Sequence, residues 1–239
     1  MKKLLRKLVL GYRSDSDNYI DYFRRLGAKI GNRTIVYEPT KTFIDATRPW
    51  MVTIGDDVKL TRGVTILTHG YDWSVLAGIN DVVLGSAGEV VIGNNVFVGM
   101  NTTILKGVHI GNNVVIGANS LVNKDIPDNC VAAGNPAKVI MTIDEYYCKR
   151  IAEQKKEAFE LYKNYVEHMG KEPPVEVFHE FFWLFWKRDE ELLPRFKQQM
   201  SRHNRFEQTL NNFKNSDPEY DGYDAFLEAA RKQKVTKNF

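Results

Sequence analysis

One histidine stands where a repeating pattern in the sequence is interrupted. His69 lies in the stretch ILTHGYDW, followed closely by Asp72 and Trp73. Imidazole is the side chain best suited to accept a proton near neutral pH, so His69 is a candidate general base. An inert loop histidine on the surface is the alternative. Asp72, Glu89 or a backbone carbonyl would each be able to orient the ring.

The interrupted pattern is a repeat of six residues. Aliphatic residues recur at every sixth position, at Ile92, Val98, Ile104, Ile110, Ile116 and Val122. Neither helical spacing nor simple strand alternation gives a period of six, which is typical of a parallel β-helix built from one short strand and one corner per hexapeptide. A small residue follows most of the aliphatics, as at Gly93, and we expect it to let the backbone turn without a Cβ clash. Antiparallel hairpins, the alternative, would not keep one phase for this long.

The phase of the repeat breaks between Ile54 and Ile92. These two residues are 38 positions apart, which predicts two 18-residue turns and two extra residues. The segment 67–89, which contains His69, therefore should form a bulging loop. The segment 42–50 (TFIDATRPW) breaks the repeat in the same way one stretch earlier.

Helical patterns flank the repeats on both sides. The opening MKKLLRKLVLGYRSD has too short an apolar run for a signal peptide and predicts a short amphipathic helix. Apolar spacing beyond residue 142 predicts a long helix that ends at Gly170, followed by further helices. The chain is thus expected to be mainly β, with an N-terminal helical segment (1–29), a β-helix domain (30–141) and an α-helical C-terminal extension (142–239).

An aromatic run, FFWLFW, lies within the C-terminal extension. With Phe178 and the apolar residues up to Met200 it has helical spacing, with a kink expected at Pro194. Aromatic residues at helical spacing usually form a core, which is the interpretation preferred here. A docking surface for a membrane or a partner is the alternative.

The composition excludes some classes of function. The net charge of +3 gives no general surface for nucleic acid, and no stretch reaches transmembrane length. Cys130 and Cys148 fit neither a metal site nor a disulfide framework and indicate a reducing compartment. We therefore expect a cytoplasmic protein with no metal, for which a peripheral membrane contact is left open but not indicated.

The run from Val52 to Ile140 resembles the hexapeptide-repeat O-acetyltransferases. These include the galactoside and maltose acetyltransferases, the streptogramin-inactivating enzymes, and the acetyltransferases of bacterial capsule and lipopolysaccharide gene clusters. The resemblance is carried by VTIGDDV, by ILTHGYDW, by the regular repeats and by the ending AAGNPAKVI, and it covers somewhat under half of the chain.

The resemblance implies a left-handed β-helix assembled as a homotrimer, with each active site between neighbouring subunits. The period itself does not give the hand, and parallel crossovers in general are right-handed. By its motif position, His69 would be the general base that removes a proton from an acceptor hydroxyl as this oxygen attacks acetyl-CoA. The favoured acceptor is a saccharide of surface-polysaccharide biosynthesis.

The resemblance also implies a set of residues that contact acetyl-CoA along the later turns. By motif position they are Gly99, Met100, Gly117, Ala118, Asn123, Lys124 and Lys138. The small residues would let the pantetheine arm approach the backbone, and the two lysines would pair with phosphates. Phe97 and Met100 depart from the tryptophan and serine of the galactoside enzymes, so a hydroxyl contact at Met100 is absent.

The acceptor site is less well defined by the sequence. Asp45, Asp72 and Trp73 are the candidate acceptor contacts, and for Asp45 a turn aspartate that caps its own backbone is an equal alternative.

Three other functions were weighed. An acetyltransferase of the same kind could inactivate an antibiotic or modify a small metabolite, and a non-catalytic scaffold could carry the same repeats. A zinc hydratase needs three converging histidines, whereas the repeats offer only His69 and His109, out of step with each other.

Overall fold

The computed structural model describes residues 2–203 and 205–233. The chain divides into two compact units, the first ending at Tyr146 and the second beginning at Tyr147. The three-part division at 29/30 and 141/142 stays a prediction.

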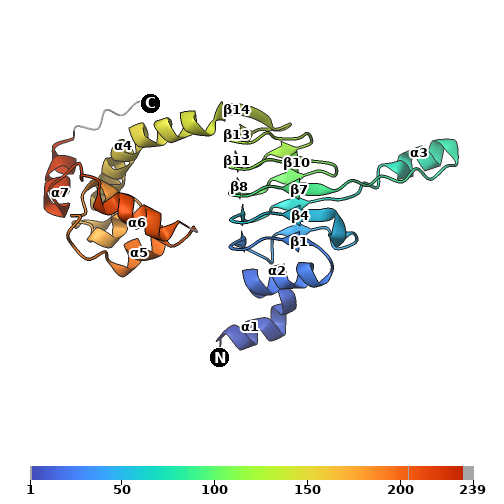
Figure 1. Cartoon of the computed structure of the whole chain (residues 1–239), viewed down its shortest axis with the longest axis horizontal. Helices are drawn as coiled ribbons and strands as arrows, with labels where there is room; N and C mark the ends of the chain where they lie inside the picture. Colours follow the sequence, from blue (N-terminus) through green and yellow to red (C-terminus); the bar gives the residue numbers. More distant parts are fainter. Residues whose placement is uncertain (1, 204, 234–239) are drawn as a thin grey trace. The chain divides into compact units, whose positions relative to one another are not determined.

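The first unit opens with two helices and continues with short strands (Figure 1). Helix α1 spans Lys2–Leu10 and α2 spans Ser16–Arg25, with Asp15 capping the N-terminus of α2 through the backbone N–H of Asn18 at 2.9 Å. The strands are β1 (Lys29–Ile30), β2 (Ile35–Val36), β3 (Phe43–Ile44), β4 (Val52–Ile54), β5 (Lys59–Leu60), β6 (Thr65–Ile66), β7 (Val90–Ile92), β8 (Val96–Val98), β9 (Thr103–Ile104), β10 (His109–Ile110), β11 (Val114–Ile116), β12 (Leu121–Val122), β13 (Cys130–Ala133) and β14 (Lys138–Thr142).

Strands β1 to β12 belong in turn to the first, second and third of three sheets, and β13 and β14 both belong to the second. The first sheet has the order β1-β4-β7-β10, the second β14-β13-β11-β8-β5-β2 and the third β12-β9-β6-β3. All neighbours are parallel except β13 and β14. In the regular part each residue pairs with the residue 18 positions on, as Thr103 does with Leu121. The predicted parallel strands with accompanying helices are confirmed.

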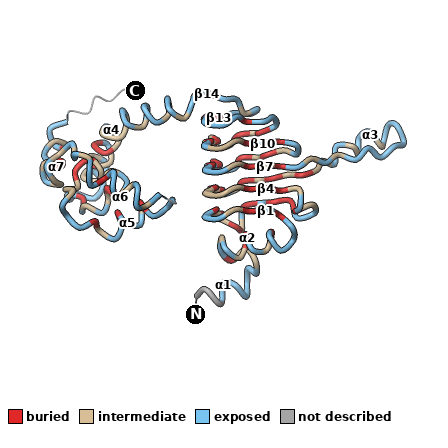
Figure 2. Tube along the Cα trace, viewed as in Figure 1, coloured by how far each residue is buried: buried red, intermediate tan, exposed pale blue. Residues whose placement is uncertain are grey.

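The repeating aliphatic residues form the core of this unit. The side chains of Ile92, Val98, Ile104, Ile110, Ile116 and Val122 are all at most 2 % exposed. Buried segments recur along the successive turns in Figure 2. Each such side chain contributes about 1.5–3 kcal/mol through removal from water, so the stacked rows hold the turns together.

The residues that make the corners differ from the prediction. The left-handed backbone lies at asparagines, with φ of 55° at both Asn95 and Asn113, and the side-chain N–H of Asn95 donates to the Oδ1 of Asn113 at 2.9 Å. Gly93 has no positive φ. A Cβ on Gly93 would lie 2.7 Å from the carbonyl oxygen of Gly111 in the next turn. The glycine therefore avoids a Cβ clash, as predicted, but the clash would be with the next turn and the left-handed residue of the corner is Asn95.

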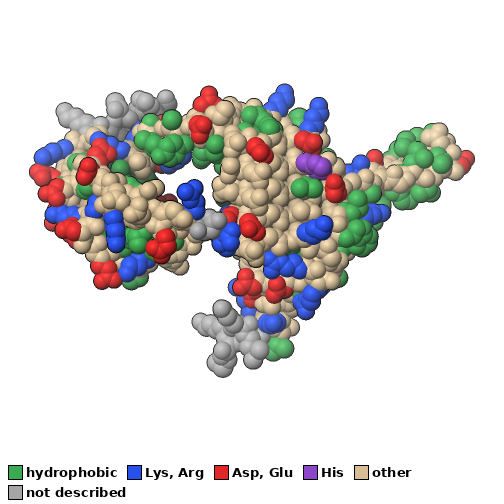
Figure 3. All heavy atoms as spheres, in the orientation of Figure 1, with side chains coloured by type: hydrophobic (Ala, Val, Ile, Leu, Met, Phe, Trp, Pro, Cys, Tyr) green, Lys and Arg blue, Asp and Glu red, His purple; other side chains and the backbone are tan. Residues whose placement is uncertain are grey.

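The loop that contains His69 is also larger than predicted. Strand β4 pairs directly with β7, and Ile54 is in register with Ile92. One 18-residue turn therefore separates them, and the remaining 20 of the 38 residues form a single arm. The arm carries α3 (Trp73–Asn80) and extends from the strands in Figure 1. Hydrophobic side chains gather on it in Figure 3.

The second unit is helical. Helix α4 (Ile143–Met169) begins in the first unit and continues into the second, and Gly170, with φ of 64°, follows it as predicted. The other elements are η3 (Val175–Phe178), η4 (Phe182–Leu184), α5 (Pro194–Met200), α6 (Phe206–Lys214) and α7 (Tyr223–Lys232). Among the described residues, none of the helices is long and apolar enough to span a membrane.

Two predictions for the second unit need correction and one is confirmed. The aromatic segment 178–186 contains the end of η3 and the whole of η4, and no α-helix. Pro194 begins α5 and does not kink a longer helix, because its missing N–H costs nothing at a first helical position. The aromatic run is core as predicted, since the Phe178 and Phe185 rings are fully buried and pack with Phe226.

Substitution of Gly93 by alanine tests the role of the corner glycines. The new Cβ would meet the backbone of Gly111, so Gly93→Ala should lower the free energy of unfolding by about 1–3 kcal/mol. Gly78→Ala in α3 is the control, because nothing lies within 4 Å of its Cβ position. Urea unfolding of both variants measures the difference, and equal stabilities would contradict the stacking role.

Candidate active site

The base of the arm holds His69 beside the third sheet. His69 follows β6 and forms an isolated antiparallel bridge with Ala87 on the returning strand of the arm. Two backbone hydrogen bonds flank this bridge, from Gly70 N to Ser86 O at 3.2 Å and from Gly88 N to Thr68 O at 3.0 Å. The imidazole is 12 % exposed and is therefore held in place while remaining in contact with solvent.

Asp45 lies directly against the His69 ring. It follows β3, which pairs with β6 in the third sheet, so both side chains lie at the same corner on successive turns. The Oδ2 of Asp45 is 2.5 Å from the Nδ1 of His69. The Asp45 side chain is 1 % exposed.

Two threonines hold the Asp45 carboxylate. Thr47 donates its backbone N–H and its hydroxyl to Oδ1, at 2.9 and 2.7 Å. Thr68 donates its backbone N–H and its hydroxyl to Oδ2, at 3.2 and 2.5 Å. Oδ1 thus accepts two hydrogen bonds from Thr47, and Oδ2 accepts two from Thr68 besides its contact with His69.

These hydrogen bonds decide the charge of Asp45 and the tautomer of His69. Burial alone raises the pKa of Asp45, but the hydrogen bonds from Thr68, Thr47 and His69 outweigh it and hold the pKa well below its ordinary value. An ionised carboxylate only accepts hydrogen bonds, so the Nδ1 of His69 must donate to it. In the neutral ring this leaves Nε2 as the basic nitrogen, which is the arrangement that a general base requires.

The predicted role of Asp45 as an acceptor contact stays a prediction. Its side chain is 1 % exposed and lies against the imidazole, which favours a role in holding His69. The alternative interpretation of a turn aspartate is partly correct, because the Thr47 N–H bond is an Asx-type contact. Sequence spacing gave no signal for the pair, because both residues lie in segments that interrupt the repeat.

The two carboxylates suggested for the orienting role lie elsewhere. The Oε1 of Glu89 is 3.4 Å from the Nε2 of His109. Asp72 immediately precedes α3 and is exposed.

An aromatic residue that the sequence interpretation missed lies edge-on to His69. The ring centroids of Tyr71 and His69 are 4.7 Å apart at an angle of 87°, and Tyr71 is 67 % exposed. Trp73, the first residue of α3, lies 6.5 Å from Tyr71 between ring centroids. The only signal in the sequence was that Tyr71 lies two residues after His69, since residues two apart in an extended segment share a face.

All the predicted acetyl-CoA contacts except Lys138 lie at corners beside the third sheet, at one end or the other of its strands. Gly99, Met100, Gly117 and Ala118 fall at the corners that lead from the second sheet into the third, and Met100 is 45 % exposed. Asn123 and Lys124 follow β12 at the corner that carries His69 two turns earlier, and both are exposed. Lys138 is the exposed first residue of β14.

The two glycines of this set have a structural cause. A Cβ on Gly99 would lie 2.5 Å from the backbone nitrogen of Ala118, and one on Gly117 would lie 2.7 Å from the Cβ of Ala133. Stacking of the turns therefore requires glycine at both positions, independently of any ligand.

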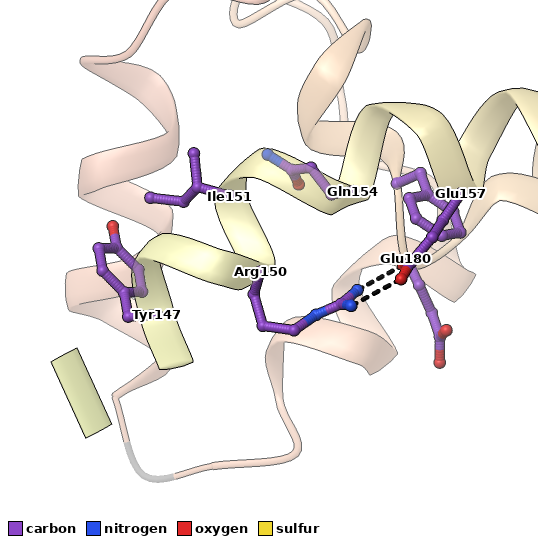
Figure 4. Close-up of a pocket in the computed structure, with 7 residues that line it drawn as sticks. Tyr147, Arg150, Ile151, Gln154, Glu157 and Glu180 are labelled. Carbon is purple, nitrogen blue, oxygen red and sulfur yellow. Dashed lines mark hydrogen bonds and ion pairs between the residues drawn. The ribbon is translucent and has the colours of Figure 1, made fainter. Parts of the chain in front are cut away.

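The second unit has a cavity of about 290 Å³ whose lining differs from the surroundings of His69. It is lined by Tyr147, Arg150, Ile151, Gln154, Glu157, Glu180 and Phe181 (Figure 4). The Arg150 guanidinium binds both carboxylate oxygens of Glu157, at 2.7 and 2.5 Å. The Glu157 carboxylate of this cavity is held by Arg150 and the lining contains no histidine, so we place the candidate active site at His69. In the described parts of the chain, no cluster of three or more His, Cys, Asp or Glu residues could hold a metal ion.

Comparison with known proteins places these features in a family. Residues 89–124 match the family model for the bacterial transferase hexapeptide (six repeats). The chain is 41 % identical over 150 residues to Protein CapG of Staphylococcus aureus, an alignment that covers 62 % of this chain and 83 % of CapG. It is 42 % identical over 104 residues to the galactoside O-acetyltransferase of Escherichia coli, covering 42 % of this chain and 50 % of that protein.

A third relative is the polysialic acid O-acetyltransferase of Escherichia coli O1:K1, which is 41 % identical over 112 residues, 46 % of this chain and 35 % of the relative. The chain thus spans most of CapG but half or less of the other two. The chain belongs to the bacterial hexapeptide-repeat transferases, and its class of enzyme is the acyltransferases.

Replacement of Asp45 by asparagine tests its contact with His69. An amide has nearly the same shape but offers no negative charge, and it can turn an N–H towards the ring and stabilise the wrong tautomer. Asp45→Asn should therefore lower kcat by about 10²–10⁴-fold, the scale of a positioned acid–base group. Asp224→Asn, at an exposed residue in the first turn of α7 that has no proposed role in the site, should change kcat little in the same steady-state assay. Equal losses in the two variants would contradict the assignment.

The ionised Asp45 should also make the stability of the fold sensitive to acid. Its pKa is lower in the folded chain than its ordinary value of 3.8, so the folded state binds fewer protons than the unfolded state. The stabilisation is fully present above the ordinary value and is lost as pH falls towards the folded pKa. The wild type should exceed Asp45→Asn in thermal midpoint at about pH 6, and the gap should narrow by about pH 3. A gap that stays constant would show that Asp45 does not titrate this way.

Proposed function

We propose that the protein transfers an acetyl group from acetyl-CoA to a hydroxyl of a saccharide, with His69 as the general base. The observation that carries this proposal is the buried, ionised Asp45 against the Nδ1 of His69, 2.5 Å away. This pair supports a basic Nε2 on a ring that is fixed but still reached by solvent. The names of two relatives, a galactoside and a polysialic acid O-acetyltransferase, supply the reaction type.

The proposed reaction needs one base and good alignment. An alcohol is a weak nucleophile until its proton leaves, so the Nε2 of His69 would take this proton as the oxygen attacks the thioester carbonyl. The new C–O bond forms, the C–S bond breaks, and the proton on His69 passes to the departing CoA thiolate. The positive imidazolium that forms in this step is stabilised by the Asp45 carboxylate. Binding of both substrates beside the ring supplies the remaining acceleration.

The acetyl-CoA site is proposed along the third sheet. Exposed candidate contacts border this sheet at both edges, Met100 and Ala118 at one and Asn123 and Lys124 at the other. Lysine ammonium groups such as those of Lys124 and Lys138 are suited to phosphate. Membership of the family supports a left-handed β-helix that assembles as a homotrimer, in which a neighbouring subunit closes this surface into a groove. Acetyl-CoA is a cytoplasmic metabolite, which supports a cytoplasmic location.

The acceptor site is proposed on the arm. Tyr71 is exposed and adjoins His69, and Trp73 lies next to it. Flat aromatic faces are suited to the apolar faces of sugar rings, and the exposed Asp72 offers oxygens to sugar hydroxyls. A precursor of a surface polysaccharide is the favoured acceptor. The two other candidates, an antibiotic or a small metabolite, would be separated from it by a screen of acetyl-CoA consumption against nucleotide sugars, lipid-linked oligosaccharides and streptogramins.

Replacement of His69 by alanine tests the proposed function directly. Loss of the base should lower kcat by about 10²–10⁴-fold while the affinity for acetyl-CoA stays nearly unchanged. Steady-state kinetics and calorimetric titration with acetyl-CoA measure both quantities.

His109→Ala is the matched control for this variant. His109 is an exposed histidine of β10 that faces Glu89 and should change kcat little. Equal losses in the two variants, or an active His69→Ala enzyme, would exclude the base role. No acetyl transfer to any hydroxyl by the wild type would favour the non-catalytic scaffold.

A further inference from the structure

The first helix of the chain presents a large apolar face to solvent. In α1 the side chains of Leu5, Leu8 and Val9 are 63, 77 and 75 % exposed. At 3.6 residues per turn these three positions share one face. Single exposed leucines are common on protein surfaces, but three on one face of a nine-residue helix are not accounted for by the fold.

The charge of α1 is entirely of one sign. Its sequence KKLLRKLVL contains four basic residues and no acidic residue. Arg6 and Lys7, the two basic residues whose side chains are described, are exposed and lie away from the apolar face at helical spacing. Leu10 lies beside these basic residues at helical spacing, but the face opposite Leu5, Leu8 and Val9 is otherwise basic. A short helix with leucines on one face and mostly lysine and arginine on the other is the type that lies in a membrane interface.

The segment that follows fixes α1 to the first unit. A positive φ of 55° at Gly11 turns the chain out of the helix. The ring of Tyr12 then stacks on Tyr22 of α2 at 3.9 Å between centroids, and Arg13 donates to the carbonyl of Pro39 at 3.1 Å. The segment that joins α1 to α2 is therefore held against the first unit by Tyr12 and Arg13. A surface bound by α1 would consequently stay close to this unit.

We infer that α1 docks this protein on an anionic membrane surface. The apolar face of Leu5, Leu8 and Val9 enters the acyl boundary, and the basic side chains pair with anionic headgroups. With nine residues the helix is too short to span the bilayer, so it lies in the plane of the interface. The docking would bring the active site to lipid-linked saccharides, and this purpose alone rests on the proposed function.

Flotation of the full chain with vesicles tests the docking without any assay of activity. The protein should float with vesicles of phosphatidylglycerol and phosphatidylcholine in equal parts, float far less with pure phosphatidylcholine, and be released as salt is raised. Arg6→Gln with Lys7→Gln should weaken the partitioning roughly 25-fold, since each basic residue contributes about fivefold. Leu5→Ser, Leu8→Ser and Val9→Ser combined should abolish it.

The matched control removes exposed apolar residues from a different place. Val75→Ser with Ile79→Ser on α3, where these side chains are 65 and 73 % exposed, should leave flotation unchanged. Circular dichroism and acetyl-CoA turnover with a soluble acceptor show that each variant is folded, and turnover should not depend on α1. Absence of flotation on anionic vesicles would overturn the inference, as would equal flotation of the triple serine variant. A lower oligomer mass of that variant by light scattering, with no vesicle binding in either form, would show instead that a second copy covers α1.

Discussion

The close stacking of one turn on the next is the constraint on which the first unit depends. Parallel strands in register at 18-residue intervals leave no room for a Cβ at corner positions such as Gly93. A Cβ added there would lie 2.7 Å from the carbonyl oxygen of Gly111 in the next turn. The same register places every sixth aliphatic residue in a buried row and every corner asparagine above another. The backbone, the core and the corners thus follow from one repeat distance.

The candidate active site depends on the same register at the point where it is interrupted. Strands β3 and β6 pair, so the segments that follow them leave the third sheet at the same corner. One of these segments carries Asp45 and the other carries His69. Two residues 24 positions apart are thereby brought to 2.5 Å, and the threonines beside them fix the charge of the carboxylate. The proposed chemistry lies where the repeat is broken, since the stacking of the turns does not determine the side chains there.

The regular features were predictable from the sequence and the irregular ones were not. The period of six gave the parallel strands and the buried row from Ile92 to Val122, because burial must repeat whenever the turn repeats. It did not give the arm, since counting from Ile54 to Ile92 cannot distinguish two turns and two residues from one turn and twenty. Nor did it reveal the partner of His69, because Asp45 lies in an out-of-phase segment whose position depends on the pairing of β3 with β6. His69 itself was identified as a candidate by the loop and by resemblance, and its role as the base stays a proposal.

The central claim is that Asp45 acts on the reaction only through the His69 ring. A double-mutant cycle measures this most directly, with kcat determined for Asp45→Asn, for His69→Ala and for the two combined. If the carboxylate works by orienting and charging the imidazole, its loss has no further effect once the ring is gone. The double variant is therefore expected to be no slower than His69→Ala alone. Losses that multiply in the double variant would contradict it.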